Sequence, residues 1–176
     1  MAAKKKPVTV VRIDRDKGDG PALYARLDAL IAAYRPDLVD ARIVLAWRVG
    51  AKPNADGLLE VGRCRRRSDV DRALEDCDFL ITLTRDVWEL MSPSQRDRAV
   101  YHEIMHAVIV LDEDGAPKRD QAGRVLTRIR RHDIELFRSE VEHFGTDGAI
   151  QSLSEVADTL VADREQPLLA SEGPSA

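Results

Sequence analysis

The chain has 176 residues, of which 44% are hydrophobic and 33% are charged, and its formal net charge at pH 7 is −4. This length suits a single domain with its own core, and the acidic balance argues against general binding to nucleic acid or to an anionic membrane surface. The sequence has no apolar run of membrane-spanning length, no secretory signal and only two cysteines, Cys64 and Cys77, so we expect a cytoplasmic protein without disulfide bonds.

The first half of the sequence alternates between helical and strand-like patterns, after a basic tail at residues 1–7 that we expect to be disordered. In chain order, the patterns predict a helix over 21–34, strands over 41–49 and 58–65, a polar stretch over 66–76 that is irregular or a short helix, and a strand over 78–84. We see no internal repeat and no linker between two cores.

We expect the strand over 78–84 to lie at an edge of the sheet. An extended peptide can add to such an edge through main-chain hydrogen bonds. Trp88, just beyond this strand, is then a candidate wall of a peptide groove, whereas Trp47 is expected in the core. An ordinary core strand is the alternative interpretation of 78–84.

A basic run at Arg63-Cys64-Arg65-Arg66-Arg67 stands out in this acidic sequence. Such a run can contact phosphate, but lysine and arginine also protect exposed strand edges. We favour a solvated edge or loop, and we do not expect nucleic acid as a partner.

A helix start signal follows at Ser92-Pro93-Ser94-Gln95, with serine at the N-cap, proline at the first helical position and glutamine three residues after the cap. Apolar residues then recur at spacings of three and four, as far as Leu111. A polar turn with a glycine at 112–115 would end the helix. The pattern predicts a helix of about 18 residues.

His102-Glu103-Ile104-Met105-His106 lies inside this helix and carries the chemistry. Residues four apart share a helix face, so His102 and His106 can bind one Zn²⁺ between them. Glu103 lies about 100° further around the helix, beside the metal, where a general base belongs. Two surface histidines on an ordinary helix are the alternative.

A catalytic zinc needs a third protein ligand. We favour His132, because it stands at a junction between a loop and a helix from which the backbone can turn it toward the first helix. The alternatives are the carboxylates of Glu135, Glu140 and Glu142, and also His143 and Asp133. A Cys64–Cys77 metal pair is disfavoured because no CxxC spacing occurs.

The C-terminal part begins with a polar loop over 115–123 and continues with a short strand over 125–129. Helices are predicted over 134–144, with Asp133 as N-cap or as a group that orients His132, and over 149–162. We therefore expect one domain over 8–163, followed by a disordered tail over 164–176.

The run His132-Asp133-Ile134-Glu135-Leu136-Phe137 resembles the H-x-x-x-x-F element that follows the active-site helix of SprT-like zinc metalloproteases. Together with the HExxH motif and the residues before it, it also resembles the putative phage metallopeptidases, small zincins of phages and prophages. The similarity covers roughly residues 20–145. It implies a zincin-like α+β fold, in which a small mixed sheet packs against the HExxH helix, and zinc-dependent cleavage of a protein or peptide substrate.

The ligands imply a mechanism in which zinc activates a water and Glu103 acts as general base. No oxyanion donor is assigned, although Tyr101 and Arg131 each precede a ligand. The alternative function is a non-catalytic zinc-binding phage or prophage protein with an interaction role. An intact Glu103 favours the enzyme, because a purely structural zinc site has no use for it.

Overall fold

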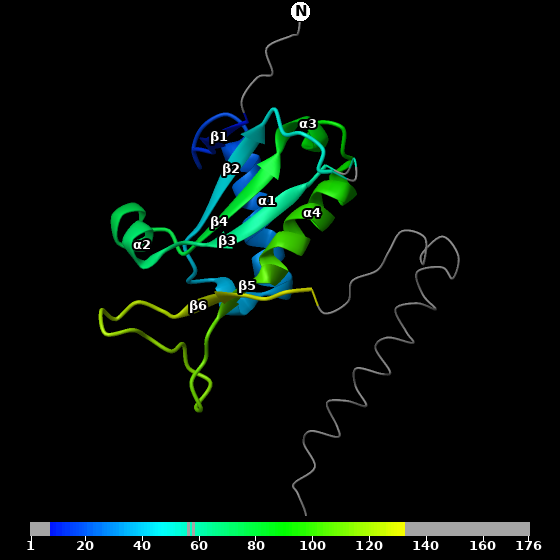
Figure 1. Cartoon of the computed structure of the whole chain (residues 1–176). Coiled ribbons are helices and arrows are strands. Elements are labelled where there is room, and N and C mark those ends of the chain that lie inside the picture. The colour runs from blue at the N-terminus through cyan, green and yellow to red at the C-terminus, as the bar shows by residue number, and fades with distance from the viewer. Residues whose placement is uncertain (1–7, 56, 58, 133–176) are drawn as a thin grey trace, which may run out of the picture. The chain divides into compact units, whose positions relative to one another are not determined.

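The computed structural model describes residues 8–132, with the exception of residues 56 and 58. This part of the chain is a mixed α+β arrangement, as predicted, with a small mixed sheet and several helices (Figure 1). The strands are β1 (Thr9–Arg12), β2 (Ile43–Val49), β3 (Gly62–Arg66), β4 (Phe79–Thr84), β5 (Ala107–Ile109) and β6 (Thr127–Ile129). The helices are α1 (Gly20–Tyr34), α2 (Asp69–Glu75), α3 (Arg85–Trp88) and α4 (Pro93–His106), and η1 (Pro36–Leu38) is a 3-10 turn.

The four-stranded sheet has the order β1-β2-β4-β3. β2 and β4 pair in parallel, and β1 and β3 pair with them in antiparallel fashion at the two edges. The two central strands are almost continuously apolar, which is typical of strands with neighbours on both sides. They form the floor on which the helices pack.

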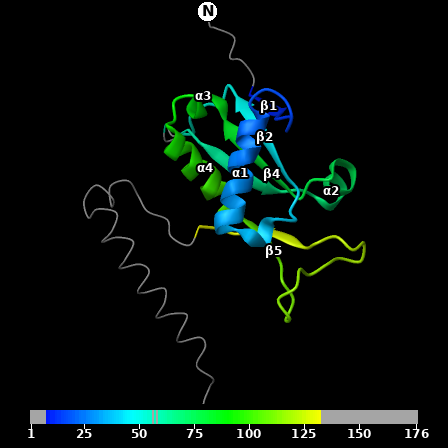
Figure 2. The same cartoon turned by 180° about the vertical axis from the view of Figure 1, so that it is seen from behind.

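α1 and α4 lie against the same face of the sheet, and they contact each other (Figure 2). Leu27 of α1, Ile104 of α4 and Ile81 of β4 are all fully buried between these elements. Because side chains alternate along a strand, Leu80 and Thr82 point to the opposite face, where they are only half-buried. α4 is thereby held against α1 on one side and against β3 on the other.

Most of the predicted elements in the described part of the chain are confirmed, with boundaries that shift by a few residues. They are the helix over 21–34, the strands over 41–49, 58–65, 78–84 and 125–129, and the short helix within 66–76. β1 was missed because all four of its residues are exposed, so it carries no one-sided apolar signal. Its place is set by pairing with β2.

The prediction that the strand over 78–84 lies at a sheet edge is wrong. β4 lies between β2 and β3, and β3 is the edge strand beside α4. The alternating pattern of β4 does not distinguish a central strand from an edge strand, because one face packs on the helices in either case. The structure shows the alternative interpretation, a core strand.

The prediction that the HExxH helix continues to about Leu111 and ends at 112–115 is also wrong. α4 ends at His106, and Ala107 already has extended backbone angles, with φ −76° and ψ 126°. Residues 107–109 form β5, which pairs in antiparallel fashion with β6. The apolar stripe continues past His106, but Val108 and Ile109 are β-branched, and they gain a sheet partner that the helical pattern does not reveal.

Residues 112–115 form a turn in the arm between β5 and β6 instead of a helix end. The Asp112 side chain accepts hydrogen bonds from the backbone N–H groups of Asp114 and Ala116, and Gly115 has φ +80°. The arm continues the pairing through bridges between Leu111 and Pro117 and between Arg119 and Val125.

The helices predicted over 134–144 and 149–162 and the domain boundary at residue 163 lie outside the described residues. Within the described part, no helix is long and apolar enough to cross a membrane.

Candidate metal centre

Both ends of α4 are fixed by side chains from elsewhere in the chain or from its own cap. At the N-terminus, the predicted capping box is present: the Ser92 hydroxyl accepts from the Gln95 N–H at 3.4 Å, and the Gln95 side chain accepts from the Ser92 N–H at 2.9 Å. Arg26 of α1 adds an ion pair with Asp97 and a hydrogen bond to the Pro93 carbonyl.

At the C-terminus of α4, the Arg35 side chain adds hydrogen bonds to two carbonyl groups at and just beyond the helix end. Its guanidinium donates to the Ile104 carbonyl at 2.8 Å and to the Ala107 carbonyl at 2.7 Å, while Asp37 holds it in place. The Arg35 side chain is mostly buried. This contact fixes the point at which the helix stops, immediately after His106.

His102 and His106 lie one turn apart on α4, as the spacing predicted, and their rings meet edge to face with centroids 5.0 Å apart. Their Nε2 atoms are 3.3 Å apart. The Nδ1 atom of His106 lies 2.7 Å from the Arg130 carbonyl. Because a carbonyl only accepts, Nδ1 is the donor in this contact, and Nε2 is the ring nitrogen that faces His102.

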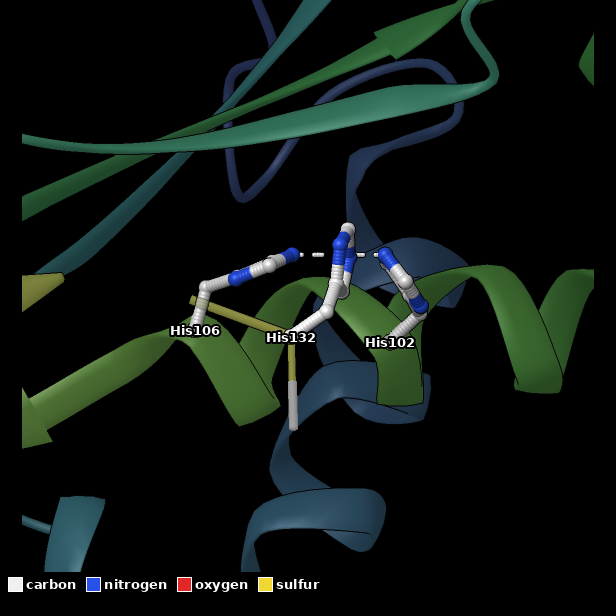
Figure 3. Close-up of side chains that lie close together, drawn as sticks. All are labelled: His102, His106 and His132. Atoms are coloured by element: carbon white, nitrogen blue, oxygen red, sulfur yellow. Dashed lines mark hydrogen bonds between the residues drawn. The ribbon is translucent and has the colours of Figure 1, made fainter. Parts of the chain in front are cut away.

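His132 brings a third imidazole to the same place. One ring nitrogen from each of His102, His106 and His132 lies within 4.8 Å of the others. Figure 3 shows the three rings converging on a common point above α4. Within the described part of the chain, these three side chains are positioned to hold a metal ion together. The other predicted third ligands, Asp133, Glu135, Glu140, Glu142 and His143, lie outside the described residues.

Glu103 lies beside the histidines but points toward the sheet, where it is only 5% exposed. Its carboxylate accepts a hydrogen bond from the Cys64 backbone amide of β3. It also abuts Gly62, where an added Cβ would lie 2.7 Å from Glu103 Oε1. Burial raises the pKa of Glu103 to about 7, although His106 and the Cys64 amide lower it.

The edge strand β3 therefore forms one wall of the centre. Val61 accepts from the Thr84 N–H, and Arg67 donates to the Asp78 carbonyl, so odd-numbered residues bond to β4. The main-chain groups of Gly62 and Cys64 consequently point away from the sheet, toward α4.

The basic run at 63–67 is mostly neutralised by neighbouring carboxylates. Arg63 pairs with Glu60, Arg66 with Asp69, and Arg67 with Glu75. Arginines that already form ion pairs with neighbouring carboxylates make a poor phosphate-binding patch. This supports the prediction that the run lies on a solvated strand edge.

Trp47 and Trp88 do not line the metal centre. Both are buried, and their rings meet edge to face at 5.8 Å. They line a cavity of about 230 Å³ that includes none of the three histidines. Trp47 is thus in the core as predicted, whereas the described structure does not support Trp88 as part of a groove at the metal.

Cys64 and Cys77 are free and buried, as expected for a chain without disulfide bonds. Burial raises the pKa of Cys64 to about 12, so its thiol stays protonated and is a poor metal ligand.

The sequence did not reveal Arg35, Gly62 and Arg130, which all shape this centre. The Arg35 guanidinium donates to backbone carbonyls at the end of α4, and the Arg130 backbone carbonyl contacts His106. Gly62 matters because it has no Cβ, which leaves room for Glu103. Only the position of Gly62 on a strand, where glycine often marks a close approach, offered a signal.

A family model described as putative phage metallopeptidase matches residues 19–161. A search of curated proteins and a search of solved structures found no match.

Proposed function

The chain belongs to the putative phage metallopeptidase family, and on this premise we propose that it is a zinc-dependent peptidase in which His102, His106 and His132 hold the metal. Tetrahedral zinc with Zn–N bonds of about 2.0–2.1 Å places its nitrogen ligands about 3.3 Å apart. The Nε2 atoms of His102 and His106 are 3.3 Å apart, which fits this geometry. Three imidazoles also leave a fourth position open, as catalytic zinc requires.

Zinc, when bound, lowers the pKa of a coordinated water to near 7 and polarises the scissile carbonyl. Glu103 accepts the proton of the attacking water and delivers it to the leaving amine. The Cys64 amide and the close approach of Gly62 restrict the positions that the carboxylate can take. His106 is oriented by its hydrogen bond to the Arg130 carbonyl.

One observation carries the proposal: a carboxylate is buried next to an imidazole cluster without an arginine or lysine to pair with it among the described residues. Burying an unpaired carboxylate costs stability. A protein that uses zinc only for folding or for an interaction gains nothing from it. A general base gains a pKa near the working pH.

The substrate in this proposal is an extended peptide that pairs with the edge strand β3. The main-chain groups of Gly62 and the carbonyl of Cys64 face the space beside Glu103, and an edge strand offers hydrogen bonds to any extended peptide. This replaces β4 as the expected edge. An edge strand beside the HExxH helix is consistent with a zincin-like arrangement. The likeness to SprT-like proteases stays a prediction.

The test compares the wild type with Glu103→Gln, using casein labelled with a self-quenching fluorophore and zinc-loaded protein. We expect hydrolysis to fall by about 10²–10⁴-fold, because this is the usual contribution of a general base. The zinc content should stay unchanged, and the midpoint of the unfolding transition should stay unchanged or rise. Glu113→Gln, an exposed change in the β5–β6 arm, is the control and should keep full activity.

Equal hydrolysis by the wild type and Glu103→Gln would remove Glu103 from the mechanism. Zinc binding by both proteins without any Glu103-dependent hydrolysis of casein or of a peptide library would instead favour the non-catalytic zinc-binding protein.

A further inference from the structure

The side chains of β3 divide between the two faces of the sheet. Cys64 lies opposite Ile81 and is buried under α4, whereas Arg63 and Arg65 lie opposite Thr82 and Leu80 and point to the other face. Both arginine side chains are exposed. Any strand that pairs with β3 will therefore place alternate side chains beside these two arginines.

The two arginines differ in their partners. Arg63 forms a hydrogen bond of 2.6 Å and an ion pair with Glu60, which also pairs with Arg48. Arg65 forms no ion pair within the described part of the chain. It is thus the cation of the edge strand whose charge remains available on this face.

The hydrogen-bonding pattern of β3 brings Arg65 close to a substrate strand that pairs with its free edge. Residues 63 and 65 direct their main-chain groups toward β4, so on the free side they occupy positions without hydrogen bonds. In antiparallel sheets these are the positions at which side chains on neighbouring strands approach most closely, with Cα atoms about 4.5 Å apart. Arg65 also follows directly after Cys64, whose amide contacts Glu103.

We propose that Arg65 is a specificity-determining residue that selects peptide substrates with an aspartate or glutamate within about two residues of the cleaved bond. This deepens the proposed peptidase function and rests on it. The acidic side chain lies across from Arg65 on the face of the sheet away from α1. Arg63 contributes less, because Glu60 already balances its charge.

An exposed cross-strand pair of opposite charges has a modest effect, so we expect acidic residues at this position to raise kcat/KM about two- to fivefold. The preference should weaken in high salt, because both groups are exposed to solvent.

The experiment digests a proteome-derived peptide library with zinc-loaded full-length protein and identifies the new termini by mass spectrometry. The wild type should show acidic residues enriched at one position near the cleaved bond. Arg65→Gln should lose this enrichment, and Arg65→Glu should reverse it in favour of lysine and arginine. Arg12→Gln is the matched control, since Arg12 is exposed on the same face at the opposite edge of the sheet, and it should keep the wild-type preference.

Cleavage without acidic enrichment, or enrichment that persists in Arg65→Glu, would overturn the role of Arg65 and leave the peptidase function intact. Absence of any cleavage that depends on Glu103 would overturn both. The second measurement uses two synthetic peptides that contain the preferred cleavage sequence, one with aspartate and one with asparagine at the selected position. The ratio of their kcat/KM values is determined for the wild type and for each variant.

Discussion

At the scale of single residues, the centre depends on how tightly Glu103 is confined. Its carboxylate is held by an amide of β3 and by the absence of a side chain at Gly62. In the proposed mechanism, the three histidines set the position of the metal, and β3 sets the position of the general base Glu103 relative to it. On this proposal, the edge strand contributes to the chemistry without supplying a catalytic side chain.

Gly62→Ala tests this confinement. The new Cβ would lie 2.7 Å from Glu103 Oε1, so the carboxylate must move. A displacement near 1 Å costs about 100-fold in rate, and we expect a fall in kcat of this order with zinc content unchanged. In the Glu103→Gln background the same change should have almost no further effect, because the base is already absent. Wild-type turnover by Gly62→Ala would show that Glu103 does not act from its position against β3.

At the scale of elements, the start of α4 could be predicted from the sequence and its end could not. The capping box is local, and Ser92, Pro93 and Gln95 reveal it by their spacing. The end is set by Arg35 and by the pairing of β5 with β6, both distant in the sequence. For the same reason the edge position of β3 was missed, since strand order follows from pairing and not from apolar alternation.

Arg35→Ala should weaken the end of α4 that carries His106. Losing hydrogen bonds from a charged group to the carbonyls of Ile104 and Ala107 should cost about 1.5–3 kcal/mol of unfolding free energy. Zinc affinity should also fall about tenfold, as is typical when groups that orient a ligand are lost. Arg26→Ala loosens the other end of α4 and is the control. It should lower stability while zinc affinity, measured by competition with a chromogenic chelator, stays the same. Equal zinc affinity in Arg35→Ala and the wild type would contradict the role given to Arg35.

A buried ion pair ties α2 to the start of β4. Arg72 donates to Asp78 at 2.7 and 2.9 Å, and neither side chain has appreciable exposure. Asp78→Ala would leave the buried Arg72 charge with only the more distant Asp69, at 3.9 Å, as an ion-pair partner among the described residues, and it should cost about 3–5 kcal/mol in urea denaturation. The exposed pair of Arg15 and Asp28 is the control, and Asp28→Ala should cost less than about 1 kcal/mol. A cost for Asp78→Ala no greater than that of the control would contradict this account.

The same pair predicts a pH dependence of stability. Burial raises the pKa of Asp78, but hydrogen bonds from Arg42 and Arg72 outweigh it and leave the pKa below its ordinary value. A carboxyl whose pKa is lower in the folded state stabilises the fold fully above its unfolded pKa, and this stabilisation is lost as pH falls through the folded pKa. The gap in urea midpoint between wild type and Asp78→Ala should therefore be constant near pH 7 and narrow below about pH 4. A difference in urea midpoint that grows as pH falls would contradict a lowered pKa for Asp78.

At the scale of the whole molecule, the mixed α+β class and the placement of His102 and His106 on one face of a helix could be predicted from the sequence, because these depend on local spacing. The structure adds that the described segments converge on one centre from α4, from β3 and from His132. The helical periodicity of the sequence could not place Gly62 against Glu103, because it describes only residues close together in the chain. That contact requires β3 to pair with β4.

Metal should stabilise the whole fold by mass action. Zinc at about 1,000 times its dissociation constant adds about 4 kcal/mol, which for a chain of this size raises Tm by about 10 °C. Differential scanning fluorimetry with and without a chelator measures this shift. His102→Ala should largely abolish it, whereas replacing the exposed Glu113 by glutamine should leave it unchanged. An equal shift in His102→Ala would mean that zinc binds elsewhere.

X-ray absorption at the zinc edge of the loaded full-length protein tests the central claim most directly. The account predicts one zinc per chain, surrounded by three imidazole nitrogens and one lighter oxygen ligand at about 2.0–2.1 Å. A spectrum with two imidazoles, with sulfur from Cys64 or Cys77, or with no stoichiometric zinc would contradict the centre formed by His102, His106 and His132.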